Sequence, residues 1–186
     1  MADINKALPL LFEVEFNNNP EKFLHKNRGE DGFTLGGVYQ KSNPYKIDWN
    51  FIDKIFKACD KSIVRASKML YYDNKTQNEV RFVFKDKYWD KLKLDRVVSQ
   101  DIANNIFLFG VLAGVSKGAK IAQRIIGTKD DGIIGNKSLA SLNVQDPKRF
   151  NKLFDNMEKE YFRELVANND KYAKFLNGWK KRAEFC

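Results

Sequence analysis

The stretch LPLLFEVEFNNNPEKFLHKNRGEDGFTLGGVY, residues 8–39, decides how the rest of this chain is organised. It begins as an apolar, helix-like segment that carries Glu13 and Glu15 near its end. A polar connector, NNNP, then leads into the glycine-rich segment GEDGFTLGGVY. In that segment Gly36 and Gly37 separate apolar residues, which is typical of a short β-hairpin. The stretch therefore predicts a helix ending in carboxylates, followed by a small hairpin lobe.

Helical spacing assigns the two glutamates to different sides of the first helix. The apolar residues at this spacing are Ile4, Ala7, Leu8, Leu11 and Phe12. At about 100° per residue, Glu13 lies about 180° from the stripe that begins at Ile4, whereas Glu15 returns close to it. We therefore expect Glu13 to face a cleft, and Glu15 to need a basic partner or a helix that ends before it. Pro9 predicts a kink or a late helix start, because it lacks an N–H and clashes with the preceding turn.

The glycine-rich segment supplies polar groups that suit glycoside cleavage. That reaction needs one carboxyl group kept protonated by apolar surroundings, and a second polar group across a cleft to hold or activate water. Glu13 is the candidate for the first group, and Asp31, Glu30 and Thr34 are the candidates for the second. Turn chemistry is the alternative explanation for the two acidic loop residues, and a plain strand position is the alternative for Thr34.

Composition limits the class of protein further. A chain of 186 residues suits one domain or two small lobes that share a core. The net charge of +9 favours anionic partners such as nucleic acid, anionic lipid or cell wall, although general solubility explains it equally well. No tight basic block or recognition motif indicates nucleic-acid binding. No apolar run reaches the roughly 20 residues of a membrane span.

The residues that usually carry metal or thiol chemistry are few. Cys59 falls on the apolar face of its helix and Cys186 is the last residue, so we expect neither a disulfide framework nor a zinc site. His25 is the single histidine, which excludes a multi-histidine metal site and most histidine-based triads. We expect it to be a solvated loop residue. No metal and no cofactor is predicted.

The remainder of the chain is predicted to be mostly helical. Asp48 is a plausible N-cap for one long helix whose buried face is Ile52, Phe56, Cys59, Ile63, Ala66 and Leu70. The pattern Thr76-Gln-Asn-Glu79 is typical of a capping box. The residues after it, 80–84, fit a helix better than the alternative, a strand. The segment 102–112 is apolar nearly all round and predicts a buried helix starting at Ser99 or Asp101, with a further helix capped by Ser116.

A last long helix is expected to open at Asp146-Pro147. Its predicted buried face is Phe150, Leu153, Phe154, Met157, Tyr161 and Leu165. Tyr88, Trp89 and Trp179 have two interpretations: they pack in the core, or they stack on sugar rings.

Three segments together resemble the glycoside hydrolase family 108 muramidases. LLFEVEFNNNP is similar to that family's signature E-G-G-Y-x-N-D-P, and GEDGFTLGGV is similar to its loop D-x-G-G-x-T-x-x-G-I. YWDKL and AKIAQRIIGTKDDGIIGNKSLASL resemble its YW motif and its C-terminal, type 3 peptidoglycan-binding region. NGWKKR resembles its GW-x-x-R ending, so the resemblance covers nearly the whole chain.

The resemblance implies a mainly α, lysozyme-like fold with a small β-hairpin lobe. The activity it implies is hydrolysis of the β-1,4 bond between N-acetylmuramic acid and N-acetylglucosamine. Glu13 would be the general acid, with Thr34 and Asp31 positioning the water or the sugar. The residues expected to bind the substrate are Glu30, Tyr39, Tyr88 and Trp89. Residues 1–95 would form the catalytic region and residues 96–186 the peptidoglycan-binding region, in one compact unit.

Members of the family are phage endolysins or bacterial proteins of the secretion-activator group. The N-terminus does not resemble a cleavable signal peptide, so we expect synthesis in the cytoplasm and release to the wall through a holin or a secretion partner. We expect a monomer, no nucleic-acid partner and no membrane insertion. The alternative function is a catalytically weak or inactive binding homologue, because Leu108 and Leu112 replace polar residues of the family pattern.

Overall fold

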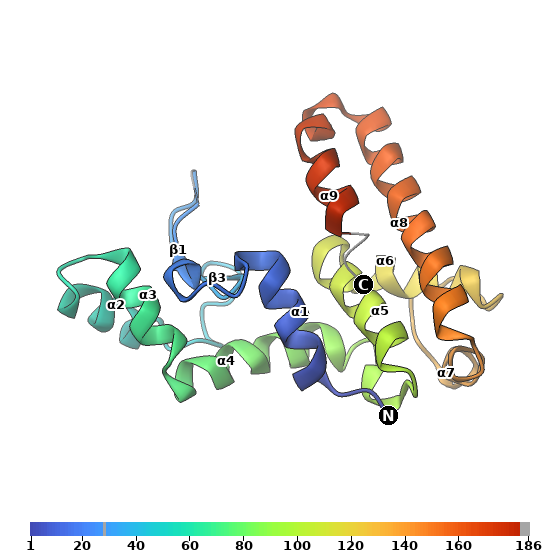
Figure 1. The fold of residues 1–186 in the computed structure, drawn as a ribbon, viewed down its shortest axis with the longest axis horizontal. Coiled ribbons are helices and arrows are strands. Elements are labelled where there is room, and N and C mark those ends of the chain that lie inside the picture. Colours follow the sequence, from blue (N-terminus) through green and yellow to red (C-terminus); the bar gives the residue numbers. More distant parts are fainter. Residues whose placement is uncertain (28, 183–186) are drawn as a thin grey trace. The chain divides into compact units, whose positions relative to one another are not determined.

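The computed structural model describes residues 1–27 and 29–182 (Figure 1). The chain divides into two compact units, one formed by residues 8–86 and the other by residues 1–7 with residues 87–186. The described part is mainly α, with one small antiparallel sheet, which confirms the predicted fold class. The boundary between the compact units falls after residue 86. The predicted division of function, with a catalytic region in residues 1–95 and a peptidoglycan-binding region in residues 96–186, stays a prediction.

The unit of residues 8–86 contains most of helix α1, a small sheet and three further helices. Its elements are α1 (Ile4–Phe16, which starts in the other unit), η1 (Pro20–Lys22), β1 (Leu24–His25), β2 (Thr34–Leu35), β3 (Val38–Tyr39), α2 (Trp49–Ala58), α3 (Ile63–Tyr71) and α4 (Asn74–Phe84). The sheet order is β1-β2-β3, antiparallel throughout.

The hairpin of β2 and β3 depends on its two glycines. Gly36 has φ +53° and Gly37 has φ +86°, the pair of positive values that a two-residue type I′ turn requires. This turn places Leu35 opposite Val38 and Thr34 opposite Tyr39. Gly36 also lies directly on the ring of Phe23, because a Cβ at position 36 would be 2.5 Å from Cε2 of that ring. Both backbone freedom and lack of a side chain are therefore needed at position 36.

The ring beneath the turn anchors the core of this unit. Phe23 is fully buried and makes edge-on contacts with Phe16 and Tyr71, each with ring centroids 5.5 Å apart. The buried Ser67 of α3 supports the same place, since its Oγ accepts from the N–H of Leu24 at 2.9 Å and donates to the carbonyl of Pro20 at 2.6 Å. One hydroxyl thus satisfies two backbone groups that α3 would otherwise bury unpaired.

The expected long helix after Asp48 is two helices. Asp48 caps α2 as predicted, accepting from the N–H of Phe51 at 3.0 Å. The chain then breaks at Asp60 and Lys61, which both adopt left-handed conformations with φ +52° and +59°. Ser62 caps the new helix α3 through the N–H of Arg65. The prediction was wrong because no glycine or proline marks the break.

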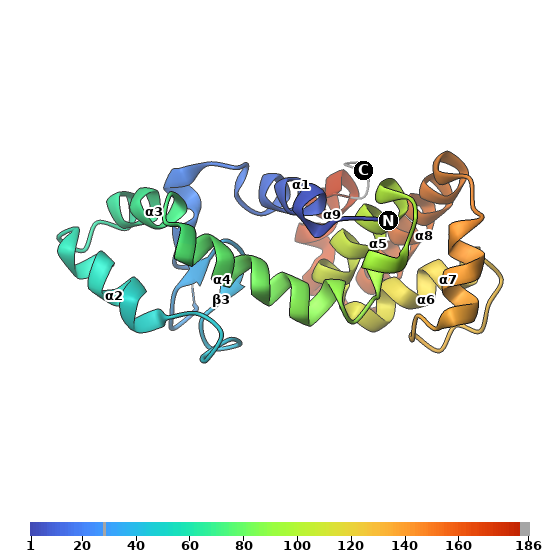
Figure 2. The same cartoon turned by 90° about the horizontal axis from the view of Figure 1, so that it is seen from below.

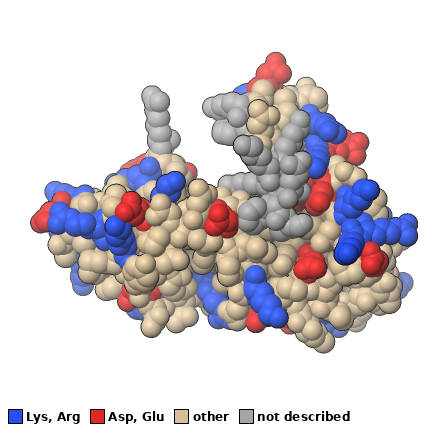
Figure 3. Space-filling model, in the orientation of Figure 1, with Lys and Arg blue, Asp and Glu red and all other residues tan. Residues whose placement is uncertain are grey.

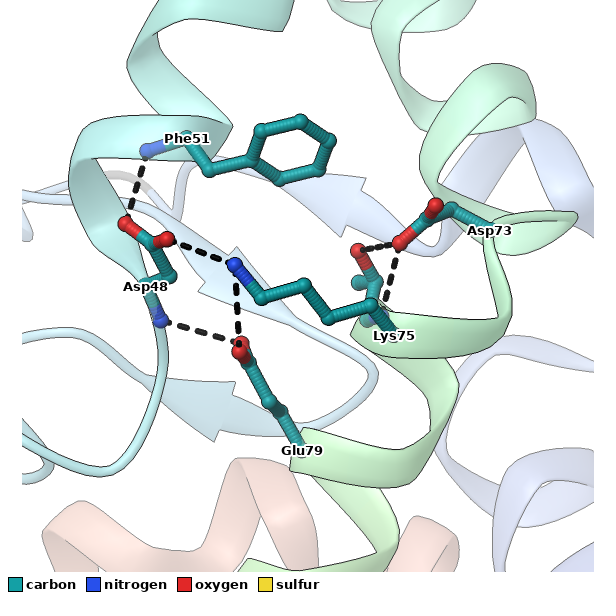
Figure 4. A network of polar contacts seen from close by, with 6 residues as sticks. Asp48, Phe51, Asp73, Lys75 and Glu79 are labelled. Atoms are coloured by element: carbon teal, nitrogen blue, oxygen red, sulfur yellow. Dashed lines mark hydrogen bonds and ion pairs between the residues drawn. The ribbon is translucent and has the colours of Figure 1, made fainter.

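A polar network joins the start of α2 to the first turns of α4 (Figure 4). Lys75 donates to Asp48 at 2.7 Å, and Glu79 accepts from the N–H of Asp48 at 2.9 Å. Asp73, rather than the expected capping box at Thr76, caps α4, accepting from both the N–H and the hydroxyl of that threonine. Hydrogen bonds to the charged form hold the pKa of Asp73 below its ordinary value. Residues 80–84 are helical, which confirms the preferred interpretation.

The other unit is built from helices among the residues that the structure describes. Its elements are η2 (Lys85–Trp89, a π-helical turn that begins in the first unit), η3 (Leu94–Arg96), α5 (Gln100–Ala113), α6 (Val115–Ile125), α7 (Asn136–Asn143), α8 (Pro147–Asn168), η4 (Asp170–Phe175) and α9 (Leu176–Arg182). Figure 2 shows α5 and α6 next to each other within it.

Helix α5 is the central helix of this unit. Ser99 caps it as predicted, and Gly114 ends it and also serves as the N-cap of α6 in place of the expected Ser116. Helices α5 and α6 approach closely at Gly118, where a Cβ would lie 3.1 Å from the carbonyl oxygen of Ile106 and 3.3 Å from Cα of Gly110. The small residues let the two backbones meet without a side chain between them.

Helix α8 starts as predicted and buries part of the predicted face, including Phe150 and Phe154. Asp146 caps it by accepting from the N–H of Arg149 at 2.8 Å, with Pro147 in the first turn. The buried residues are Phe150, Phe154, Glu158 and Phe162. Leu153, expected in the core, is 41% exposed. The periodicity argument selected the face with the most apolar residues. The structure instead buries residues at a spacing of four, and one of these four, Glu158, is an acid.

Glu158 is a buried carboxyl group beside a second one. Its side chain lies one turn along α8 from Asp155, which accepts from Nδ2 of the buried Asn105 of α5 at 3.3 Å. Burial, and then the neighbouring charge of Asp155, raises the pKa of Glu158 to about 8. Glu158 is therefore mostly protonated at neutral pH.

In the part of the chain that is described, no helix combines the length and apolar character that a membrane span requires.

Substitution of Gly36 by alanine should destabilise the protein more than the same change at Gly29. Both glycines have positive φ, but a Cβ at position 29 meets no atom within 4 Å, whereas one at position 36 overlaps Phe23. We expect Gly29→Ala to cost about 1 kcal/mol and Gly36→Ala roughly 2–4 kcal/mol, the difference being overpacking. Urea unfolding followed by far-UV circular dichroism measures both. Equal losses would contradict the steric argument.

The buried acid should give the protein a falling stability between pH 4.5 and 8. Because its pKa rises from 4.5 unfolded to about 8 folded, the protonated form's stabilisation is complete below pH 4.5 and is lost as pH rises through 8. The total is on the order of 3–5 kcal/mol. Glu158→Gln should flatten this part of the curve, while the exposed Glu164→Gln should not. The measurement is the melting temperature of each variant across this pH range. If the melting temperatures of wild type and Glu158→Gln change in parallel with pH, the assignment to Glu158 is contradicted.

Candidate active site

The end of α1 holds Glu13 in a defined position. The helix starts at Ile4 and continues through Pro9 to Phe16, so the expected late start is wrong. It ends because Asn17 and Asn18 adopt left-handed conformations. Nδ2 of Asn18 then turns back and donates to Oε2 of Glu13 at 2.8 Å and to the carbonyl of Pro9 at 3.2 Å. Glu13 is half-buried and held by an amide donor, rather than enclosed by apolar groups.

Glu15, one residue from the end of the same helix, lies against the hairpin turn. A Cβ on Gly37 would be 3.3 Å from Cγ and 3.5 Å from Oε2 of Glu15. One of the two alternatives predicted for Glu15 was that the helix ends before it. That alternative is wrong, because α1 continues to Phe16. The approach brings the last turn of α1 and the hairpin together within one compact unit.

The loop before β2 is tied to the hairpin through Glu30. Its Oε2 accepts from Nδ2 of Asn27 at 3.0 Å and from Oγ1 of Thr34 at 3.3 Å. Thr34 is buried at 5% exposure, and Tyr39 lies opposite it across the strands. Three of the predicted site residues are therefore neighbours. Asn27 was not predicted, and only the turn that joins it to Glu30 brings it there.

Asp31 lies on the outside of this loop. Its side chain is 95% exposed and accepts from Nζ of Lys41 at 2.8 Å. The hydrogen bond and the charge of that ammonium group hold the pKa of Asp31 below its usual range. Asp31 is therefore a carboxylate at neutral pH. It can act as a base or a charge partner, but not as a proton donor.

A shallow hollow of about 500 Å³ adjoins Asp31 in the same unit. It is lined by Lys26, Asp31, Gly32, Phe33, Gln40, Lys41, Pro44 and Trp49. Nζ of Lys26 lies 4.6 Å from the centre of the Phe33 ring, and Oε1 of Gln40 accepts from the N–H of Phe33 at 3.0 Å. Sequence reasoning missed the lysines and the glutamine, because only the register of the hairpin brings them to one place.

The aromatic pair Tyr88-Trp89 belongs to the other compact unit, which includes residues 87–186. Trp89 is 1% exposed and packs edge-on against Phe107 of α5, with ring centroids 5.4 Å apart. Its assignment to sugar binding is corrected by this burial, since no ring face reaches solvent. Tyr88 is half-buried in the same π-helical turn. The core alternative therefore holds for Trp89.

The candidates for metal or thiol chemistry among the described residues are His25, Cys59 and the acidic side chains. Residues 1–27 and 29–182 contain no group of three His, Cys, Asp or Glu side chains that could hold a metal ion. Nδ1 of His25 lies 3.0 Å from the carbonyl of Lys22. Cys59 is a buried free cysteine, and the prediction for Cys186 lies outside the described residues.

Comparison with protein families identifies a class for part of the chain. Residues 117–184, from the start of α6 onward, match the family model described as "Predicted Peptidoglycan domain". The match covers well under half of the chain, and the expected membership of glycoside hydrolase family 108 stays a prediction.

Among solved structures, the chain is similar to SagA of Brucella abortus. The two share 17% sequence identity, and the match covers 96% of this chain and 92% of that one with a TM-score of 0.57. At this identity the likeness shows the fold alone. A search of curated protein sequences found no match.

Removal of the Glu30 side chain should loosen the loop that precedes β2. Glu30→Ala deletes both hydrogen bonds, to Asn27 and to Thr34, so we expect amide hydrogen exchange in residues 29–34 to accelerate about tenfold. Asp31→Ala, which deletes only an exposed ion pair, is the matched control and should change exchange by less than about twofold. Equal acceleration in both variants would show that Glu30 does not order the loop.

Proposed function

We propose that this protein is a peptidoglycan hydrolase of the muramidase type. The observation that carries the proposal is the approach of Glu15, near the end of α1, to Gly37 of the hairpin, whose Thr34 is hydrogen-bonded to Glu30, within one compact unit. The match of residues 117–184 to a predicted peptidoglycan domain supports the same polymer as the binding target. The similarity to SagA supports the fold on which such a site would sit.

In this proposal Glu13 protonates the oxygen of the leaving sugar. The side chain is half-buried, and Asn18 fixes it by its amide, so a bound saccharide would complete its exclusion from water. General acid catalysis of glycoside cleavage requires such a positioned carboxyl group.

The second polar group of the proposed reaction comes from the loop. In the proposal Thr34, whose hydroxyl donates to Glu30, helps to position the sugar or the water, and Asp31 supplies a carboxylate that stays ionised. Tyr39 lies opposite Thr34 and can contact the same sugar. The reaction uses only these side chains, with no cofactor. Release to the wall by a holin or a secretion partner, and a monomeric state, belong to the same proposal.

A second function, peptidoglycan binding without hydrolysis, is favoured by how the loop carboxylates are engaged. Glu30 accepts from two side chains, and Asp31 is paired with Lys41. In addition, Leu108 on α5 is apolar, whereas the glycoside hydrolase family 108 pattern that the chain resembles has a polar residue at this position. The two functions differ only in whether bond cleavage accompanies binding.

Glu13→Gln should abolish lysis while leaving binding intact. The substitution keeps the shape and the contact with Asn18 but removes the proton donor, so we expect the rate to fall about 10²–10⁴-fold. The measurement is turbidity loss of purified, outer-membrane-stripped peptidoglycan, with muropeptides analysed for new reducing ends.

Two further variants are matched controls for this assay. Glu21→Gln changes an exposed glutamate that pairs with Lys68 and should lyse like wild type, and Glu15→Gln tests the neighbouring acid. Wild type that pellets with peptidoglycan but releases nothing would establish the binding function. Lysis by Glu13→Gln at the wild-type rate would overturn the assignment of the acid.

A further inference from the structure

Helices α6 and α8 form a groove whose two walls carry opposite charge. The groove has a volume of about 240 Å³. Its α6 wall presents Lys117, Lys120 and Arg124, at the spacing that puts residues on one helix face. On the face that Figure 3 shows, Lys and Arg are interspersed with Asp and Glu, so the net charge of +9 does not form one block there.

The α8 wall presents two acids over an apolar floor. Glu160 and Glu164 are exposed residues one turn apart on α8. Ile121, Met157 and Tyr161 complete the groove, and the ring of Tyr161 is half-buried. Burial, with the nearby Tyr172, raises the pKa of Tyr161, so its phenol is neutral at physiological pH.

The two walls do not neutralise each other. Lys117 lies over the ring of Tyr161, with Nζ 5.7 Å from its centre, and Arg124 is paired at 2.8 Å with Asp130 of the following loop. Among the side chains that the structure describes, which leave out those of residues 28, 174, 175 and 180–186, Glu160 and Glu164 form no ion pair. The basic side chains of one wall are therefore not paired with the acidic side chains of the other, which fits a ligand that carries both signs of charge.

We propose that this groove binds the stem peptide of peptidoglycan, with peptide carboxylates on Lys117 and Lys120 and the free side-chain ammonium of the diamino acid on Glu160 and Glu164. Each part of that ligand has a counterpart. The stem peptide bears carboxylates at its D-glutamate and its diamino acid, and its methyl groups and aliphatic chains fit the floor at Ile121, Met157 and Tyr161. The inference rests on the proposed function, because it names the part of the polymer that the region 117–184 recognises.

The experiment compares two probes that differ only in the amine. One is N-acetylmuramyl-L-alanyl-D-glutamyl-meso-diaminopimelate, and the other is the same compound acetylated on its side-chain amine. In calorimetric titrations, Glu160→Gln/Glu164→Gln should weaken the free-amine probe about fivefold or more and the acetylated probe less than about twofold. Lys117→Gln/Lys120→Gln should weaken both. Lys148→Gln/Lys152→Gln, near the start of α8 and outside the groove, removes the same number of positive charges as the lysine variant and is its control.

The outcomes separate this inference from the proposed function. Pelleting with whole sacculi by wild type, together with no binding of either probe, would overturn the groove and leave the proposed function standing. Equal binding of the free-amine probe by wild type and Glu160→Gln/Glu164→Gln would overturn it as well, and would leave the groove to a different mixed-charge partner. Failure of wild type to pellet with sacculi would overturn both. Circular dichroism checks that each variant is folded.

Discussion

The turn at Gly36-Gly37 is the constraint on which the candidate site depends. Positive φ at both positions closes the hairpin in two residues, and the missing side chain of Gly36 lets the turn lie on the ring of Phe23. That ring is the centre of an aromatic core with Phe16 and Tyr71, so the hairpin is fixed to the helices. Because Gly37 simultaneously contacts Glu15, the same turn fixes the end of α1. Two residues thus set how the last turn of α1, with Glu15, lies against the hairpin.

Electrostatics then distribute different roles among the acids. Exposed acids beside lysines, such as Asp31 with Lys41, are held in the charged form, and water screens what they contribute to stability. Glu158 is the opposite case, because burial and Asp155 keep its proton at neutral pH. Burial, rather than residue type, decides which acid can donate a proton. Glu13 is half-buried beside the amide of Asn18, so in the proposed reaction the bound sugar supplies the remaining exclusion of water.

Much of the fold could be predicted, because short-range chemistry marks it. Side chains that cap helices, Asp48, Ser99 and Asp146, and the Gly-Gly turn act within a few residues and are visible in sequence. The break at Asp60-Lys61 was missed because neither residue usually adopts a left-handed conformation, and only the packing of α2 and α3 imposes it. Phe150 and Phe154 were correctly expected on the buried face of α8, but Glu158 and Phe162 were missed, because periodicity counts apolar residues and does not expect an acid in a core.

The candidate site shows the same limit. The sequence singled out Glu13, Glu30 and Thr34 as candidates, since carboxylates and hydroxyls around glycines are unusual enough to notice, and the structure joins Glu30 to Thr34 by a hydrogen bond. It could not separate Trp89, a core residue, from a sugar platform, because both use the same large ring. Nor could it find the groove of α6 and α8, whose lysines and glutamates are 40 or more residues apart and individually ordinary. These residues become informative only in the structure, where basic and acidic side chains line one groove without pairing. A polymer that carries carboxylates and amines on one peptide is complementary in charge to such a groove.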